Sequence, residues 1–151
     1  MIKLTVIEND GEDLAYKISR QTARNNGIAV SRVYAASDAP DADILVVSPS
    51  CVPLPRDERK KPRCKVLLLP GGVGAGFADP KSVVTYGMNS KNTLTLSSIG
   101  QENCVLALQR ELVTASGGVV DRQEFKVRSS GGADDLLAVS GALLLLDMPL
   151  S

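Results

Sequence analysis

Short polar residues and glycines stand in three loops, each directly after an apolar, strand-like run. The residues in these loops are Asn9, Asp10 and Gly11, then Ser48 and Ser50, then Gly71, Gly72 and Gly74. In an α/β domain, ligands bind at the carboxyl ends of parallel strands. We therefore predict a ligand site whose contacts come from backbone amides and short polar side chains rather than from acid/base groups.

The composition excludes several kinds of chemistry. The 151 residues contain no His, which removes Ser-His and Cys-His nucleophiles, His-ligated zinc and the usual acid/base group near neutral pH. Seventeen Lys and Arg balance 17 Asp and Glu, so the net charge of zero disfavours a nucleic-acid partner. We predict no catalytic residue, no cofactor and no resident metal.

The first loop stands where a phosphate-binding loop would stand, but it is acidic. Such a loop needs a Lys for the phosphates and a Ser or Thr for Mg²⁺, whereas Glu12 and Asp13 follow Gly11 here. The favoured interpretation is that these acids stabilise the start of a helix. The alternative is a Mg²⁺ or Ca²⁺ site formed by Glu8, Asp10 and Asp13.

The glycine-rich segment 71–76 follows a buried strand-like run. A helix start would complete a dinucleotide fingerprint, but Phe77 and residues 78–80 follow instead. A flexible connection is favoured over a nest of amides that binds an anion.

The three cysteines, Cys51, Cys64 and Cys104, are widely spaced and form no C-x-x-C pair. Free cysteines mostly pack as small apolar residues, so we expect all three thiols to be buried and inert. Cys51 is the one next to a candidate loop.

The elements that must position these loops are read from hydrophobic spacing. Near-continuous apolar runs predict parallel strands at residues 4–7, 28–34, 44–47, 66–69 and 83–87. A helix is predicted over residues 12–25, with Leu14, Ile18 and Thr22 on one face. The segment 53–62, charged and bounded by prolines, is predicted to be a polar loop.

The pattern changes after residue 93. Apolar residues alternate over 93–96, 105–112 and 124–128, which predicts antiparallel hairpin strands, although 105–112 also suits a turn or two of helix. A last helix is predicted over 133–147. We expect one three-layer, Rossmann-like α/β domain over residues 1–151, with a mainly parallel sheet, antiparallel strands near the C-terminus and a final helix. No export signal or membrane span is visible, which predicts a cytoplasmic protein without membrane contact.

Read in order, these segments resemble the ATP-binding central domain of the Mur ligases, which form amide bonds in peptidoglycan precursors. Residues 6–14 look like that family's strand and T-G-T-N-G-K-T-T loop, and residues 42–50 look like its strand ending in E-V-S-S. Residues 83–87 (VVTYG) are similar to its V-I-T-Y-G, and residues 134–150 are similar to its last helix, ending A-L-G-V-P-L. Further strands match in order at 27–30, 65–72, 93–99 and 124–127.

The departures from the Mur pattern decide what the resemblance implies. Glu12 stands where the family has its phosphate-binding Lys, Asp13 stands at its Thr for Mg²⁺, and Val46 stands at its Mg²⁺-binding Glu. The nucleotide-contacting H-N-x-x-N falls on residues 130–134, which contain neither His nor Asn. Phosphoryl transfer depends on a Lys and on bound Mg²⁺ that stabilise the negative charge of the phosphates. The resemblance therefore implies a non-catalytic domain that binds an unknown small ligand or a protein partner and is linked to cell-wall processes.

Two alternatives remain open. Residues 67–72 (LLLPGG) also resemble the P-G-G turn of the DJ-1 and class I amidotransferase-like families, which would imply a thiol-dependent enzyme using Cys51 or Cys104. The last helix is apolar on more than one face, which is compatible with a homo-oligomerising structural module. The residues concerned are Leu136, Leu137, Val139, Leu143, Leu144 and Leu146. For these residues, burial within the chain's own domain is the favoured interpretation.

Overall fold

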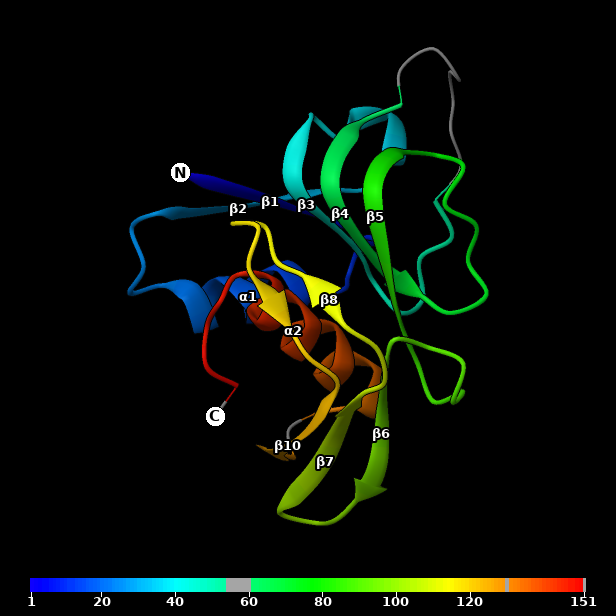
Figure 1. The fold of residues 1–151 in the computed structure, drawn as a ribbon. Helices are drawn as coiled ribbons and strands as arrows, with labels where there is room; N and C mark the ends of the chain where they lie inside the picture. The colour runs from blue at the N-terminus through cyan, green and yellow to red at the C-terminus, as the bar shows by residue number, and fades with distance from the viewer. Residues whose placement is uncertain (54–60, 130, 151) are drawn as a thin grey trace.

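A single sheet of eight strands organises residues 1–53, 61–129 and 131–150, which are the residues that the computed structural model describes. The strands are β1 (Ile2–Ile7), β2 (Ile28–Val33), β3 (Ala42–Val47), β4 (Arg63–Pro70), β5 (Asp79–Tyr86), β6 (Leu94–Ile99), β7 (Asn103–Leu108) and β10 (Gln123–Arg128). Their order across the sheet is β10-β7-β6-β5-β4-β3-β1-β2 (Figure 1). Most of the predicted polar loop 53–62 lies outside the described residues.

The N-terminal part of the sheet is parallel, as predicted. β1 pairs with β2 and with β3, β3 pairs with β4, and β4 pairs with β5, with Leu4 opposite Ile44 and Ile44 opposite Val66. The apolar runs of β1, β3 and β4 are buried on both faces. This explains why these strands read as continuous apolar runs rather than as alternating ones.

The C-terminal part of the sheet is antiparallel, also as predicted. β6 pairs with β7 and β7 pairs with β10, so residues 105–108 form a strand and the helical alternative for this segment is wrong. β5 and β6 pair only at Tyr86 and Leu94, so the antiparallel strands extend beyond the carboxyl ends of the parallel ones (Figure 1). A second, two-stranded sheet of β8 (Leu112–Val113) and β9 (Val119–Val120) was not predicted.

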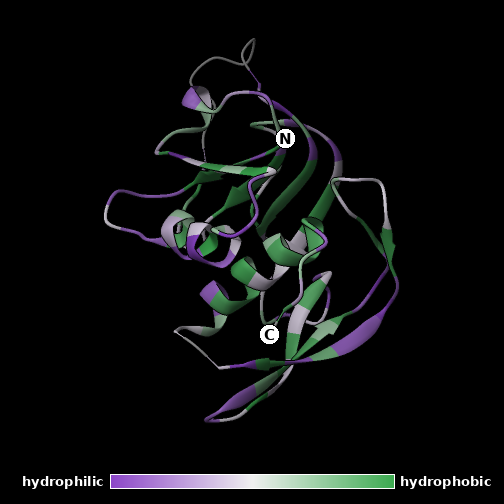
Figure 2. Ribbon diagram, turned by 90° about the vertical axis from the view of Figure 1, so that its left-hand side faces the viewer, coloured by the Kyte–Doolittle hydropathy of each residue, from purple (hydrophilic) through white to green (hydrophobic). Residues whose placement is uncertain are grey.

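Both α-helices pack on one face of the sheet. α1 (Leu14–Thr22) is shorter at both ends than the predicted helix 12–25, but it buries Leu14, Ile18 and Thr22 as predicted. α2 (Ala133–Leu145) follows Gly132 and ends two residues before the predicted position 147. The helices lie beside each other (Figure 2). Their buried side chains join one apolar core with those of the strands.

The opposite face of the sheet is covered by connecting segments. The 3₁₀ turn η1 (Ala36–Asp38) contributes Ala36, and the loop between β4 and β5 contributes Phe77 and Ala78 to a second apolar cluster. This loop has only eight residues, 71–78, whereas parallel strands are usually joined by a longer crossover with a helix. Eight extended residues reach about 26–29 Å, which is enough to return along an eight-residue strand. The sheet thus lies between a layer of helices and a layer of connecting segments, and the predicted Rossmann-like α/β architecture is confirmed.

α2 joins the two parts of the sheet. Gly141 lies against Leu68 of β4 and Leu94 of β6, so closely that a Cβ atom at this position would stand 3.0 Å from each of these two side chains. After Leu145 the chain turns away at Asp147, whose φ is 58°. No helix in the described residues is both long and apolar enough to cross a lipid bilayer.

Candidate functional site

A cleft of about 570 Å³ lies at the carboxyl ends of the parallel strands, where the antiparallel strands begin. Its walls come from the segment after β3, from the ends of β4 and β5, from the loop 87–92 and from the first turn of α2. Its polar side chains are Asn89, Lys91, Asn92 and Asp134. The volume lies within the range of small-molecule sites, which is about 300–1,000 Å³.

The cleft contains two of the predicted site residues, Gly71 and Gly72. Gly72 has a φ of 87°, which a glycine adopts without strain. Gly74 is exposed farther along the same loop and does not line the cleft. The loop connects β4 to β5 and buries Phe77 and Ala78 at its end.

The buried side chain of Asn92 fixes the floor of the cleft. Its Nδ2 donates to the carbonyl oxygen of Asn89 at 3.0 Å, and the amide group lies directly over Gly71 and Gly87. A Cβ atom at Gly71 would stand 2.1 Å from Oδ1 of Asn92, and one at Gly87 would stand 2.8 Å from Nδ2. The amide of Gly71 also donates to the carbonyl oxygen of Tyr86 at 2.9 Å. Both glycines are therefore required by a close approach of Asn92.

Tyr86 serves the structure of the cleft rather than its chemistry. Its hydroxyl donates to the carbonyl oxygen of Val47 at 2.6 Å and ties β5 to β3 across β4. Burial raises the pKa of this phenol far above its ordinary value, and the carboxylates of Asp134 and Asp135 raise it further. The hydroxyl therefore stays protonated and continues to donate.

The acidic loop after β1 is bonded to the chain itself. The fully buried carboxylate of Glu8 accepts the backbone N–H groups of Leu14 at 2.9 Å and Ala15 at 3.3 Å. Its second oxygen lies 3.4 Å from Nη1 of Arg32. The amides at the helix start are therefore capped by Glu8, whereas Asp13, the N-cap residue that was predicted to stabilise this start, makes no cap hydrogen bond from its side chain. An internal carboxylate thus fills the place where a helix N-terminus would bind an anion.

Glu12 links the loops after β1 and β3. One carboxylate oxygen accepts both the amide of Asn9 at 2.8 Å and the hydroxyl of Ser48 at 3.0 Å. Asn9 in turn donates from Nδ2 to the carbonyl oxygen of Ser50 at 3.1 Å. Asn9, Ser48 and Ser50, three predicted site residues, are thus brought together, but they bond to one another or to Glu12, and none of them lines the cleft.

The other two predicted residues of the first loop, Asp10 and Gly11, are exposed and lie outside the cleft. Gly11 has a φ of 90°, so the turn itself requires a glycine. The alternative of a metal site from Glu8, Asp10 and Asp13 gains no support, because Glu8 is engaged by the helix. Across residues 1–53, 61–129 and 131–150, no group of three Cys, Asp or Glu side chains is arranged to hold a metal ion.

All three cysteines are buried, as predicted. Burial raises the pKa of the Cys51 thiol, and the carboxylates of Glu12 and Glu8 raise it further. Burial also raises the pKa of Cys64 to about 11. Cys104 lies with its sulfur 3.0 Å from the Ser129 hydroxyl. These environments disfavour a reactive thiolate at Cys51 and Cys64.

Sequence reasoning missed all four of these polar side chains, namely Asn89, Lys91, Asn92 and Asp134. A signal was present, because residues 87–92 (GMNSKN) follow a strand of the parallel sheet and have the composition of a loop. The H-N-x-x-N motif of the Mur ligases was aligned with residues 130–134, and this alignment gave Asp134 no role in binding. Ser130 lies outside the described residues.

Comparisons with known proteins give this chain no family. No protein-family model matches it, and no curated protein matches it significantly.

Proposed function

We propose that this chain is a Mur-ligase-like domain that binds a small ligand or a protein partner without catalysing a reaction, and that it serves cell-wall processes. The support for this lineage is the order of the sequence segments and the mainly parallel sheet, which continues into antiparallel strands and a final helix.

One observation carries the non-catalytic part of the proposal, namely the carboxylate of Glu8 at the N-terminus of α1. In a nucleotide-binding loop, the phosphates occupy the first amides of this helix. Here Glu8 accepts the amides of Leu14 and Ala15 from inside the fold. A phosphate would have to displace a buried carboxylate and would then meet Glu12, which lies between Asn9 and Ser48.

The cleft at the ends of β4 and β5 is where we place the ligand. Lys91 offers a positive charge at one part of its wall and Asp134 a negative charge at another. The backbone amides of Gly71 and Gly87 already donate within the fold, so side chains of the loop 87–92 supply the remaining contacts. The described residues that line the cleft include no Ser, Thr or Cys side chain, which favours binding over covalent catalysis.

A ligand titration tests the proposal. Thermal unfolding is followed with ATP or UDP-N-acetylglucosamine, each with and without Mg²⁺. A ligand at about 100 times its dissociation constant stabilises the fold by about 2.7 kcal/mol, which raises Tm by several degrees. We expect no shift with Mg²⁺-ATP, whereas a Mg²⁺-dependent shift with ATP would contradict the proposal.

Two variants test whether the ligand binds in the cleft. Lys91→Ala removes the one cationic side chain among the described residues of the cleft wall, whereas Lys81→Ala removes an exposed cation of β5 that lies outside it. For any ligand that raises Tm, we expect Lys91→Ala to reduce the shift and Lys81→Ala to leave it unchanged. Equal effects of the two substitutions would place the ligand elsewhere.

A further inference from the structure

A second cavity, of about 450 Å³, lies on the helical face of the molecule between α1 and α2. It shares no lining residue with the cleft at the strand ends. Figure 2 views the molecule from the side on which α1, α2 and the C-terminus lie together. We call this second cavity the interhelical groove.

The floor of the interhelical groove is apolar. Leu136, Val139 and Leu143 follow one another on one side of α2 at spacings of three and four residues, and Leu150 closes the groove from the C-terminal segment. Leu136, Val139 and Leu150 remain partly exposed although they pack against the main core. The stripe from residue 136 to 143 is about 10 Å long at 1.5 Å per helical residue.

The rim of the interhelical groove is cationic. The charge of Lys17 is compensated by two ion pairs, because its ammonium lies 2.6 Å from Asp135 and 3.5 Å from Asp13. Arg20 and Arg128 also line the groove, and in the described part of the chain neither has a carboxylate within 4.0 Å.

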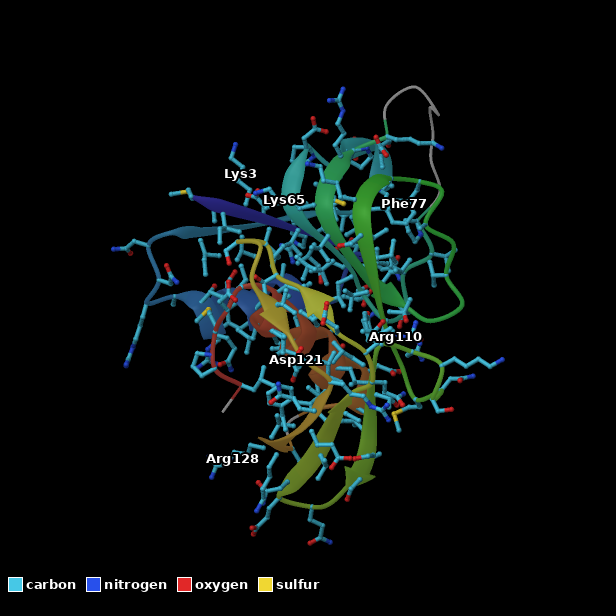
Figure 3. All side chains as sticks on the ribbon, viewed as in Figure 1. Lys3, Lys65, Phe77, Arg110, Asp121 and Arg128 are labelled. Carbon is cyan, nitrogen blue, oxygen red and sulfur yellow. The ribbon has the colours of Figure 1, made fainter. Side chains whose placement is uncertain are left out.

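The two guanidinium groups come from different elements. Arg20 lies with its guanidinium carbon 5.9 Å from the ring centre of Tyr16 on α1, and Arg128 extends outward from the end of β10 (Figure 3). The groove lining thus carries Lys17, Arg20 and Arg128 against the single carboxylate of Asp135, an excess of positive charge in a chain whose net charge is zero.

We propose that the interhelical groove binds an amphiphilic anion, a single apolar chain with a carboxylate or phosphate head group. The chain lies along Leu136, Val139 and Leu143, and the head group is bound by Arg20 and Arg128. Guanidinium groups suit this role because their planar N–H donors match carboxylate and phosphate oxygens. The volume is that of a small-molecule site, and both arginines belong to the same cavity, which favours one bound head group over an extended membrane surface.

Calorimetric titration with decyl phosphate and decanoate below their micelle concentrations tests this proposal. We expect saturable binding of both anions with one site per chain, and no saturable binding of decyltrimethylammonium, which has the same chain and the opposite charge. Inorganic phosphate alone is expected to bind at least tenfold more weakly than decyl phosphate, because it leaves the apolar floor uncovered.

Three substitutions at partly or fully exposed positions locate the site. Arg20→Gln and Arg128→Gln are each expected to weaken the binding of decyl phosphate about tenfold. Val139→Asp places a negative charge on the floor and is expected to abolish binding. Arg24→Gln, at an exposed arginine outside the groove, is the matched control and is expected to leave affinity unchanged.

Other results would overturn the proposal. Equal binding of the cationic amphiphile, or equal effects of Arg20→Gln and Arg24→Gln, would exclude recognition of an anion in this groove. Sedimentation with phosphatidylglycerol vesicles, without saturable binding of either monomeric anion, would identify a membrane surface instead. Binding of a glutamate-rich helical peptide without binding of decyl phosphate would identify a protein partner.

Discussion

Individual residues maintain the shape of the cleft. The closest approach is that of the Asn92 side chain to Gly71, where a Cβ atom would stand 2.1 Å from Oδ1. Replacement of Gly71 by Ala forces a Cβ atom against Oδ1 of the buried Asn92, which is itself held by Asn89. We expect Gly71→Ala to lower the free energy of unfolding by about 1–3 kcal/mol, as overpacking does elsewhere. Urea denaturation followed by circular dichroism measures this change.

Gly74→Ala is the matched control for this substitution. Nothing lies within 4 Å of a Cβ atom at Gly74, and its backbone is not left-handed. We expect Gly74→Ala to be neutral or to stabilise the fold by about 0.4–1 kcal/mol. If Asn92 is the cause of the clash, Asn92→Ala will remove most of the penalty of Gly71→Ala. Full additivity of the two changes would contradict this explanation.

Glu8 caps the N-terminus of α1, so its substitution is expected to change the free energy of unfolding. Glu8→Ala leaves the amides of Leu14 and Ala15 at the start of α1 without their acceptor. We expect a loss of about 2 kcal/mol in the free energy of unfolding, at the upper end of the effect of a lost helix cap. Asp10→Ala, at an exposed carboxylate of the same loop, is expected to change stability by less than about 0.5 kcal/mol. Equal effects would show that Glu8 does not cap α1.

The site residues were only partly predictable from the sequence. The three loops were located correctly because the ends of parallel strands can be read from apolar runs. The sequence could not show that Asn9 would bind Ser50 and that Ser48 would bind Glu12 rather than a ligand, because these contacts join residues about 40 positions apart. For the same reason, the position of Asn92 over Gly71 had no local signal.

Among the elements, Asp43 of β3 connects the beginnings of three neighbouring strands. Its carboxylate accepts the backbone amide of Lys3 in β1 at 2.8 Å and lies 3.4 Å from the ammonium of Lys65 in β4. The hydrogen bond from Lys3 lowers the pKa of Asp43 below its ordinary value, and Lys65 lowers it further.

This pKa gives a pH-dependent prediction. A carboxylate with a lowered pKa in the folded state stabilises the fold above its unfolded pKa of about 3.9, and this stabilisation is lost as pH falls through the folded pKa. We expect Asp43→Asn to cost up to about 1 kcal/mol at pH 7, and the cost to disappear toward pH 2.5. Urea unfolding of both proteins across this range measures the difference.

Asp121→Asn is the control for this pH dependence, because Asp121 is exposed and its side chain has no ion pair among the described residues. Its effect is expected to be small at both pH values. A cost of Asp43→Asn that stays constant from pH 7 to pH 2.5 would contradict the proposed role of the charge.

The elements themselves were more predictable than the contacts between them. Apolar runs marked the parallel strands, and alternation marked β6, β7 and β10, because each pattern follows from which strand faces are buried. The short strands β8 and β9 were missed, since two residues are too few for periodicity. The bounds of α1 depend on Glu8, which lies six residues before the helix begins, so spacing within the helix could not reveal them.

For the whole molecule, α2 and the continuous sheet join the parallel and antiparallel parts. Gly141 packs against Leu68 in the parallel part and Leu94 in the antiparallel part, and one apolar core includes side chains of both parts. We therefore expect the described fold to unfold as one cooperative unit.

Two probes check this cooperativity. Far-ultraviolet circular dichroism reports all helices and strands. Of the three tyrosines, Tyr16 and Tyr34 are exposed in the folded state and Tyr86 is buried between the two parts, so the change in tyrosine fluorescence on unfolding is expected to come mainly from Tyr86. Their urea transitions are expected to coincide. Separate midpoints would show that the antiparallel strands unfold independently of the parallel sheet.

The central claim is that an internal carboxylate occupies the helix N-terminus where a nucleotide's phosphates would bind. The most direct test is a titration of the ¹⁵N-labelled protein with Mg²⁺-ATP, followed by the amide resonances of Leu14 and Ala15, the two groups that donate to Glu8. We predict that both resonances stay in place at millimolar Mg²⁺-ATP. A saturable, Mg²⁺-dependent shift of these two resonances would contradict the claim and would indicate a functional nucleotide site.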